Sequence, residues 1–216
     1  NKRLILDNGE MAFDQLVIAI GSKSNFFGND NIKRNALPMK SIDQAVELRN
    51  TLLNIAEMAS LQEKKEDLVA LRNIVIAGGG PAGVEIAGML AELRAHALSK
   101  LYPELDKDAL NIYMIEGDGC LLGGMRKESS DYALKCMNDL GIKTMLNTRV
   151  NDYVDDKVEL SNGETILSKT LVWTTGVVVE KMKGLENATY ERGNRILVSE
   201  HNEVIGYDNI FAIGDV

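Results

Sequence analysis

Two spacings of apolar residues along the chain predict which segments are helices and which are strands. Apolar side chains three and four positions apart predict a helix from Ser41 to about residue 60, and Ser41 with Gln44 matches a capping box at its start. Helix formers also follow residue 83 up to about residue 98. A third helix is expected over 129–140, with Gly141 just past its end.

Short continuous apolar runs predict strands that are buried on both faces. Two of them, at 74–77 and 112–116, and a third, more polar strand expected at 143–147 are separated by predicted helices, which is the pattern of a parallel sheet. After residue 150 the chain changes to short strands, followed by an apolar strand that ends at Gly176. The pattern predicts an α/β fold with a Rossmann-like parallel sheet and a β-meander.

The beginning of the chain is predicted to form a hairpin that ends in a buried strand. Leu4 to Leu6, a turn at Asn8–Gly9 and the apolar run Leu16–Ile20 carry this prediction. Two polar segments are interpreted as irregular: 25–38 as a linker that contains a domain boundary, and 62–67 as a solvated loop.

Two parts of the chain repeat one arrangement. An Asn-Gly-Glu turn at 8–10 is followed by an apolar strand and Gly21, and the same turn at 162–164 is followed by an apolar strand and Gly176. One interpretation is a coincidence between two common hairpins. The other is that the chain holds the endings of two similar dinucleotide-binding units but one glycine-rich beginning, with the second beginning expected upstream of Asn1.

A glycine-rich segment separates the strand at 74–77 from the helix that follows it. It consists of Gly78, Gly79, Gly80, Pro81, Ala82 and Gly83, and its first, third and last residues fit the dinucleotide-binding fingerprint. In that fingerprint the first glycine permits a tight turn, the second lets the backbone approach a pyrophosphate, and the third allows close packing of helix on strand. Because a helix N-terminus also favours phosphate, we interpret the segment as a nucleotide-binding loop, with a purely structural turn as the alternative.

Glu116 ends the second predicted strand of the sheet. A carboxylate at this strand end accepts hydrogen bonds from the ribose hydroxyls of the adenosine and repels a 2′-phosphate, which favours NAD over NADP. It follows Gly80 at a longer interval than the roughly 20 residues of the fingerprint. We expect an insertion over 99–111 that lengthens the crossover and accounts for the difference.

Composition and charge narrow the possible functions. The 216 residues carry a formal net charge of −8 with a sequence pI of about 4.9, which argues against a surface that binds DNA or RNA. Cys120 and Cys136 lack the spacing of a redox dithiol or a zinc site and are interpreted as free thiols of a reducing compartment. His96 and His201 are interpreted as surface residues, so no metal site is expected, and no apolar run has the length of a membrane span.

Further motifs resemble those of the FAD-dependent pyridine nucleotide oxidoreductases. The segment 207–215 resembles the second FAD motif of that family, and 18–22 resembles its Ala-Thr-Gly motif with Ile20 in place of the threonine. Within the family, the segments 21–28 and 39–41, the glycine-rich loop, and Glu116 followed by Leu121–Leu122 are most similar to the type II NADH dehydrogenases, which are single-subunit NADH:quinone oxidoreductases. The resemblance covers nearly the whole chain.

The resemblance implies a division into domains and a set of site residues. Residues 1–25 and 193–216 are expected to be pieces of a split FAD-binding domain, with an NAD(H)-binding domain over 36–176 between them. The residues expected to bind cofactors are Gly78, Gly79, Gly80, Pro81, Ala82, Gly83, Glu116 and Gly176 on the NADH side, and Gly21, Gly214 and Asp215 in the FAD-domain pieces. Glu85 is expected near the nicotinamide and flavin as a catalytic residue, the alternative being a first-turn acid that suits the helix dipole.

The resemblance also implies an activity. Hydride passes from NADH to FAD and electrons pass on to a quinone, in a cytoplasmic protein attached peripherally to the inner face of the cell membrane. The alternatives are a reductase of ferredoxin or of a disulfide, and a non-catalytic NADH-sensing module. We expect the chain by itself to lack the first FAD glycine loop, to bind NADH without retaining FAD, and to be inactive. The strand ending at Gly21 is expected to pair with a second copy of the chain.

Overall fold

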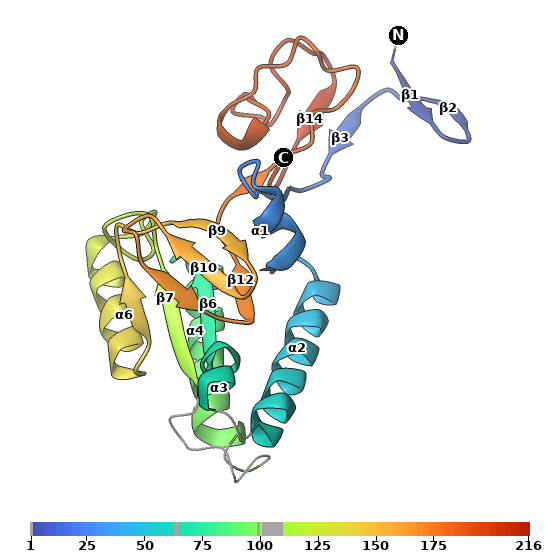
Figure 1. The fold of residues 1–216 in the computed structure, drawn as a ribbon. Helices are drawn as coiled ribbons and strands as arrows, with labels where there is room; N and C mark the ends of the chain where they lie inside the picture. Colours follow the sequence, from blue (N-terminus) through green and yellow to red (C-terminus); the bar gives the residue numbers. More distant parts are fainter. Residues whose placement is uncertain (1, 63–64, 99, 101–109) are drawn as a thin grey trace. The chain divides into compact units, whose positions relative to one another are not determined.

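The computed structural model describes residues 2–62, 65–98, 100 and 110–216 (Figure 1). They form two compact units: the split unit, made of Asn1–Asn25 and Val177–Val216, and the continuous unit, Phe26–Gly176. Each unit has an apolar core of its own.

The continuous unit is built on a five-stranded sheet. In spatial order its strands are β5 (Leu37–Pro38), β12 (Thr170–Trp173), β6 (Asn73–Ala77), β7 (Asn111–Ile115) and β8 (Lys143–Met145). All neighbouring pairs are parallel, so the five strands end at one edge of the sheet. The parallel sheet predicted from the apolar runs is confirmed.

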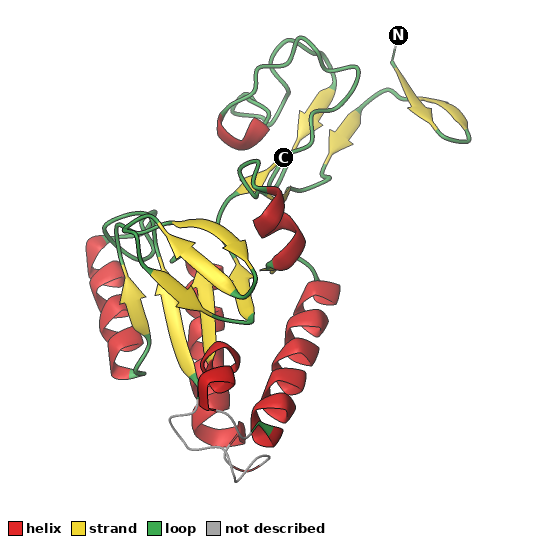
Figure 2. Cartoon of the chain, in the orientation of Figure 1, coloured by secondary structure: helices red, strands yellow, loops and turns green. Residues whose placement is uncertain are grey.

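Helices cover one face of this sheet, as Figure 2 shows. They are α2 (Ile42–Leu61), α4 (Pro81–Leu93) and α6 (Lys127–Asp139), and their apolar side chains pack on Ile74 and Ile76, which are fully buried. The capping box of Ser41 and Gln44 is present at the start of α2, and Gly141 follows α6 with a φ of +68°. These helix predictions are confirmed, except that α4 continues into a turn of π-helix, η1 (Arg94–Leu98).

The predicted meander lies on the other face of the sheet. Its strands are β9 (Val150–Val154), β10 (Lys157–Leu160) and β11 (Thr165–Leu167), which form an antiparallel sheet. Val75 and Ala77 of β6 pack against this layer, whereas Ile74 and Ile76 pack on the helices. Since both faces of β6 are covered, its sequence is continuously apolar rather than alternating.

The segment 25–38 is not the predicted linker. It contains α1 (Asp30–Asn35) and β5, and both belong to the continuous unit. Asn29 caps α1 by accepting hydrogen bonds from two backbone N–H groups, and its own amide donates to Asn151 O at 2.9 Å and to Asp152 Oδ1 at 3.2 Å. The amide of Asn31 donates to Asp152 Oδ2 at 3.0 Å. Contacts with β9 therefore stabilise this short helix, and its own residues could not predict them.

The segment 62–67 was also predicted as a loop, but α3 (Lys65–Arg72) begins inside it. Leu68 and Leu71 of α3 pack on Ile55 and Ala59 of α2, and this apolar contact stabilises a helix whose first turn is highly charged. The insertion expected over 99–111 lies almost wholly outside the described residues.

The split unit consists of short strands around a small core. Its elements are β1 (Arg3–Leu6), β2 (Gly9–Ala12), β3 (Leu16–Ile18), β4 (Lys23–Ser24), β13 (Val177–Val178), the single-turn helix η2 (Arg192–Asn194) and β14 (Ile210–Ala212). β1 pairs with β2, β3 pairs in parallel with β14, and β4 pairs with β13. Ile18 and Ala212 of the β3–β14 pair belong to the core of this unit.

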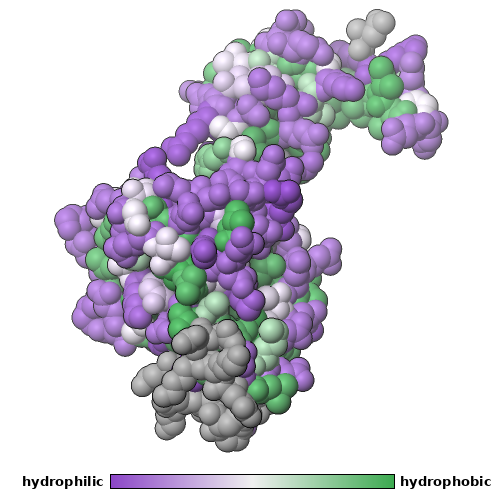
Figure 3. Space-filling model, viewed as in Figure 1, coloured by the Kyte–Doolittle hydropathy of each residue, from purple (hydrophilic) through white to green (hydrophobic). Residues whose placement is uncertain are grey.

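Two predictions about this unit are wrong. The second strand of the hairpin is Gly9–Ala12 and not the apolar run that follows it, because the turn at Asn8–Gly9 pairs the residues next to it. The apolar run is not buried on both faces: Val17 is 56% exposed and Ile20 is 59% exposed. Figure 3 shows apolar side chains on the surface of the hairpin, where Ile5 is 83% exposed.

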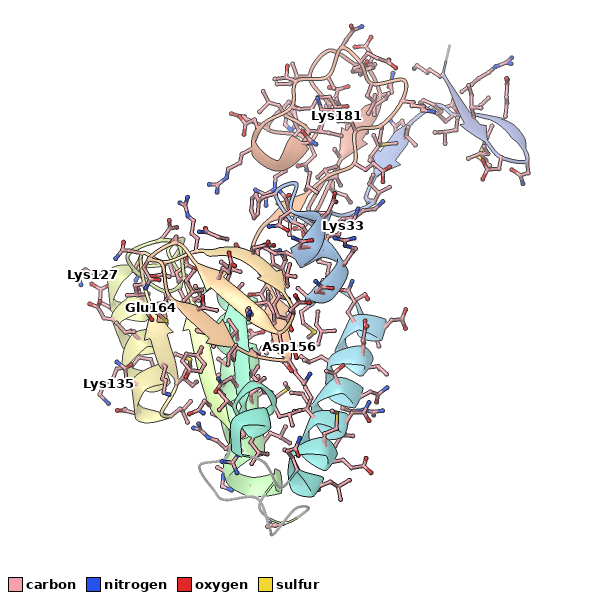
Figure 4. All side chains as sticks on the ribbon, in the orientation of Figure 1. Lys33, Lys127, Lys135, Asp156, Glu164 and Lys181 are labelled. Atoms are coloured by element: carbon pink, nitrogen blue, oxygen red, sulfur yellow. The ribbon has the colours of Figure 1, made fainter. Side chains whose placement is uncertain are left out.

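Charged side chains cover the outer side of α6. Lys127 and Lys135, both labelled in Figure 4, form ion pairs one turn along the helix with Asp131 and Asp139. Among the described residues, no helix is both long enough and apolar enough to cross a membrane.

Candidate functional site

The glycine-rich loop lies at the edge where β6, β7 and β12 end. Gly78 N donates to Ile115 O of β7 at 2.9 Å, and Thr174 N, just after β12, donates to Ala77 O at 2.9 Å. The Thr174 hydroxyl also lies 2.8 Å from Ala77 O and 3.2 Å from Gly78 O. The loop is thus bonded to the strand on each side of it. This is the carboxyl edge, where parallel α/β sheets bind ligands.

Three glycines of the loop have no room for a side chain. A β carbon at Gly83 would lie 1.9 Å from Gly78 O, and one at Gly79 would lie 2.5 Å from Leu121 Cδ2. Gly78 has a φ of +113°, and a β carbon there would lie 2.8 Å from Thr174 Oγ1. The backbone therefore requires glycine at Gly78 and Gly83, whereas a side chain at Gly79 would displace the side chain of Leu121.

Gly80 differs from its neighbours because the fold leaves space around it. It has a φ of −73°, which any residue adopts, and a β carbon there would meet no atom within 4 Å. Gly80 is the N-cap of α4 and makes no side-chain cap, while Pro81 begins the helix and Ala82 is exposed. Open space and uncapped N–H groups at a helix start fit the phosphates of a nucleotide.

Glu116 lies beside this loop, where the sequence pattern predicted it. It is half-buried just after β7. Its Oε2 accepts a hydrogen bond from Gly79 N at 2.5 Å, and its Oε1 accepts one from Asp118 N at 2.8 Å. Each carboxylate oxygen has capacity for a further hydrogen bond. Glu116 therefore holds the loop in place and can still accept hydrogen bonds from ribose hydroxyls.

The loop after β7 packs on the glycine-rich loop, which no motif in the sequence indicated. Leu121 is fully buried against Gly79, and Leu122 N donates to Gly79 O at 2.8 Å. Leu122 has a φ of +52°, which is unusual for a leucine. The pair Leu121–Leu122 was noted in the sequence as part of the resemblance, but nothing in the pattern indicated that it contacts Gly79.

Glu85 is exposed on α4 and is the fifth residue of that helix. The alternative interpretation as a first-turn acid is wrong, because no acidic residue lies in the first turn of α4. Gly176, with a φ of +71°, ends the segment after β12.

In the split unit, Gly21 from the first chain segment lies near Gly214 and Asp215 from the second. β3 and β14 run in parallel, and Ile213 N donates to Ile18 O at 3.0 Å, so Gly21 and Gly214 follow neighbouring strand ends. The hydroxyl of Ser22 lies 3.1 Å from Asp215 Oδ2. Ser22 was not among the predicted site residues, although it directly follows Gly21.

The cysteines were predicted to be free thiols and the histidines to be surface residues. Cys120 is exposed and Cys136 is half-buried, and both are free thiols. His96 and His201 are exposed.

Comparisons with known proteins point to one family. The family described as pyridine nucleotide-disulphide oxidoreductase matches residues 1–216. A probable NADH dehydrogenase of Dictyostelium discoideum is 32% identical over 209 residues, which are 95% of this chain and 46% of that protein. The type II NADH:quinone oxidoreductase Ndh of Mycobacterium tuberculosis is 28% identical over 212 residues, which are 94% of this chain and 46% of that protein.

Among solved structures, the chain is similar to NDH2 from Plasmodium falciparum in complex with NADH. The TM-score is 0.86 at 27% identity, and the match covers 99% of this chain and 46% of that chain. The chain thus spans about half the length of the relatives that it matches.

Proposed function

The chain belongs to the pyridine nucleotide-disulphide oxidoreductase family, and from this premise we propose that it is the NADH-binding part of a flavoprotein that passes hydride to FAD and electrons to a quinone. The relatives support this activity, because one is a probable NADH dehydrogenase and another is a type II NADH:quinone oxidoreductase. NADH, a proton and a quinone would give NAD⁺ and a quinol. In this proposal the continuous unit, including residues 36–176, binds NADH, and residues 1–25 and 193–216 belong to an FAD-binding domain.

The observation that carries NADH binding is the open space at Gly80. Close neighbours within the fold crowd the other glycines of the loop, whereas Gly80 has neither a positive φ nor a neighbouring atom that excludes a side chain. A glycine there is explained by a ligand whose pyrophosphate comes close to the backbone. The start of α4, from Gly80 to Gly83, would face the phosphates, and Glu116 would accept hydrogen bonds from the adenosine ribose.

Flavin binding is proposed for the split unit, where Gly21, Gly214 and Asp215 lie near one another. Asp215 would accept a hydrogen bond from a hydroxyl of the flavin's side chain, and Ser22 would orient that carboxylate. When bound, the nicotinamide supplies a hydride and the flavin accepts it, which is chemistry that belongs to these cofactors.

Gly80→Ala tests NADH binding. We expect the affinity of the chain for NADH to fall at least about tenfold, because the methyl group occupies space next to the pyrophosphate, with the free energy of unfolding within about 1 kcal/mol of the original. Calorimetric titration and urea unfolding measure the two quantities. The matched control is Gly88→Ala in α4, where a β carbon also meets nothing within 4 Å. It should stabilise the helix by about 0.5–1 kcal/mol and leave NADH affinity unchanged. If Gly80→Ala binds NADH normally, the loop is a structural turn.

Glu85 is proposed to act beside the nicotinamide. Glu85→Gln in the flavin-loaded enzyme should lower kcat for NADH oxidation by about a hundredfold or more, the usual scale for a positioned acid or base. Asp43→Asn, at an exposed acid in the first turn of α2, is the control. Unchanged kinetics for Glu85→Gln would remove it from the mechanism.

The acceptor is proposed to be a quinone. Assays of the flavin-loaded enzyme with a quinone, ferredoxin and a small disulfide separate the three kinds of reductase, and turnover with the quinone alone is expected. NADH binding without turnover by any acceptor would instead identify a sensing module.

The partner and location follow from the same proposal. We propose peripheral attachment to the cytoplasmic face of the cell membrane, so the protein should sediment with membranes and be released by salt or carbonate. We also propose that a second copy pairs along the edge of β3 that β14 leaves open. Sedimentation that shows monomers alone would contradict this pairing.

A further inference from the structure

The loop after β8 places a cationic side chain against Gly117, the residue that follows Glu116. Arg149 lies over Gly117: a β carbon at Gly117 would be 2.9 Å from Arg149 Nε and 3.1 Å from its Cγ. Arg149 is exposed, and among the residues that the structure describes no carboxylate forms an ion pair with it. Its charge is therefore available to a ligand at this edge of the sheet.

Backbone hydrogen bonds fix the position of Arg149 relative to Glu116. Glu116 N donates to Met145 O at 2.9 Å, and Thr148 N donates to Glu116 O at 2.9 Å. On its other side, Arg149 N donates to Ser161 Oγ at 2.9 Å, while Ser161 N donates to Arg149 O at 2.8 Å. The arginine is thus held between the loop after β7 and the turn after β10.

The charges around this position have opposite effects on a phosphate. Glu116 and the exposed Asp118 repel an anion, whereas Arg149 attracts one. A guanidinium binds phosphate through several N–H groups and remains charged at all physiological pH values. In a nucleotide whose ribose lies against Glu116, an added 2′-phosphate would come close to Arg149.

We propose that Arg149 is a specificity-determining residue, which offsets the repulsion by Glu116 so that the site binds NADPH as well as NADH, though more weakly. The proposal rests on the proposed function, because it assumes that the ribose binds at Glu116. It differs from the expectation drawn from Glu116 alone, which is exclusion of the 2′-phosphate.

Titration of the chain with NADH and with NADPH tests the proposal. Arg149→Gln should raise the Kd for NADPH at least tenfold and the Kd for NADH less than threefold. For Arg149→Lys, which keeps the charge, the Kd for NADPH should lie between that of the original chain and that of Arg149→Gln. The loss for NADPH should shrink as the salt concentration rises, because the interaction is between charges near solvent. Arg49→Gln on α2, the matched control that removes the same charge elsewhere, should change neither affinity.

Each other outcome has a distinct meaning. An equal loss for both nucleotides, or no loss for either, overturns the role of Arg149 in specificity and leaves it as a general contact or as cover for Gly117. NADH binding with no measurable NADPH binding by the unmodified chain overturns the inference and leaves the proposed function standing. Failure of the unmodified chain to bind NADH contradicts the proposed function itself. If Arg149→Gln does not fold, Arg149→Met carries the same test.

Discussion

Gly83 has the least room for a side chain of any position in the glycine-rich loop. A methyl group there overlaps the carbonyl oxygen of Gly78, 1.9 Å away, so the backbone of the loop must move. Gly83→Ala should lower the free energy of unfolding by about 2–3 kcal/mol, the upper range for overpacking a tight site. Urea unfolding measures the change. A loss below about 0.5 kcal/mol would show that the loop adjusts freely, contrary to the close approach of helix and strand.

At the residue scale, the sequence predicted which residues lie at the site better than it predicted their contacts. Glu116 was expected at the end of its strand because a strand length and a residue type suffice to place it. Its hydrogen bonds to Gly79 and Asp118 could not be predicted, since they depend on how the loop after β7 folds back. Arg149 was missed for the same reason: it comes near Glu116 through pairing of strands that are distant in the sequence.

Asp152 holds α1 against β9 and makes that contact sensitive to acid. Partial burial raises the pKa of Asp152, but the hydrogen bonds donated by Asn31, the Tyr153 N–H and Asn29 lower it by more, so the pKa lies below its ordinary value. A carboxylate with a lower pKa in the folded state binds fewer protons there than in the unfolded state. Its contribution to the free energy of unfolding is therefore present above the unfolded pKa of about 3.9 and is lost as the pH falls below that value.

We therefore expect Asp152→Asn to be less stable than the original chain near neutral pH and to approach it in stability below about pH 4. Unfolding in urea at several pH values measures this convergence. Asp139→Asn on α6, where the acid forms an exposed ion pair, is the control for a general effect of charge. A difference in stability for Asp152→Asn that is the same at pH 3 and pH 7 would contradict the explanation.

At the scale of elements, prediction succeeded where an element is long or continuously apolar. The helix α2 and the strand β6 are examples, because their own residues carry the signal. The six-residue helix α1 is too short to show a period, and its stability comes from the cap at Asn29 and from β9. The exposed face of β3 was mispredicted because apolar composition alone does not show how many neighbours a strand has.

Among the described residues, the two units share no core residue. The clusters around Ile74, Val75 and Ile55 lie wholly within Phe26–Gly176, and the cluster around Ile18 lies wholly within the split unit. We expect residues 26–176 alone to fold and to bind NADH with a Kd within about threefold of that of the whole chain, because the loop and Glu116 are both included. Circular dichroism and calorimetric titration test this. An unfolded product, or one that folds without binding, would show that the split unit is needed.

At the scale of the whole molecule, the sequence predicted the class of fold and a boundary near residue 25, but it left 26–35 in a linker. Those residues join the continuous unit because α1 packs on the meander. The proposed assignment of the split unit to flavin binding rests on the resemblance and on the nearness of Gly21 to Gly214 and Asp215.

The free space at Gly80 also predicts how variants would be distributed in a saturation library. Sorting cells by the abundance of folded protein should retain many small residues at position 80 and reject almost everything but glycine at position 83. Selecting the same library for growth that depends on NADH oxidation should reject variants at both positions. The difference between the two selections would then identify position 80 as one where glycine is needed for the ligand and not for the fold.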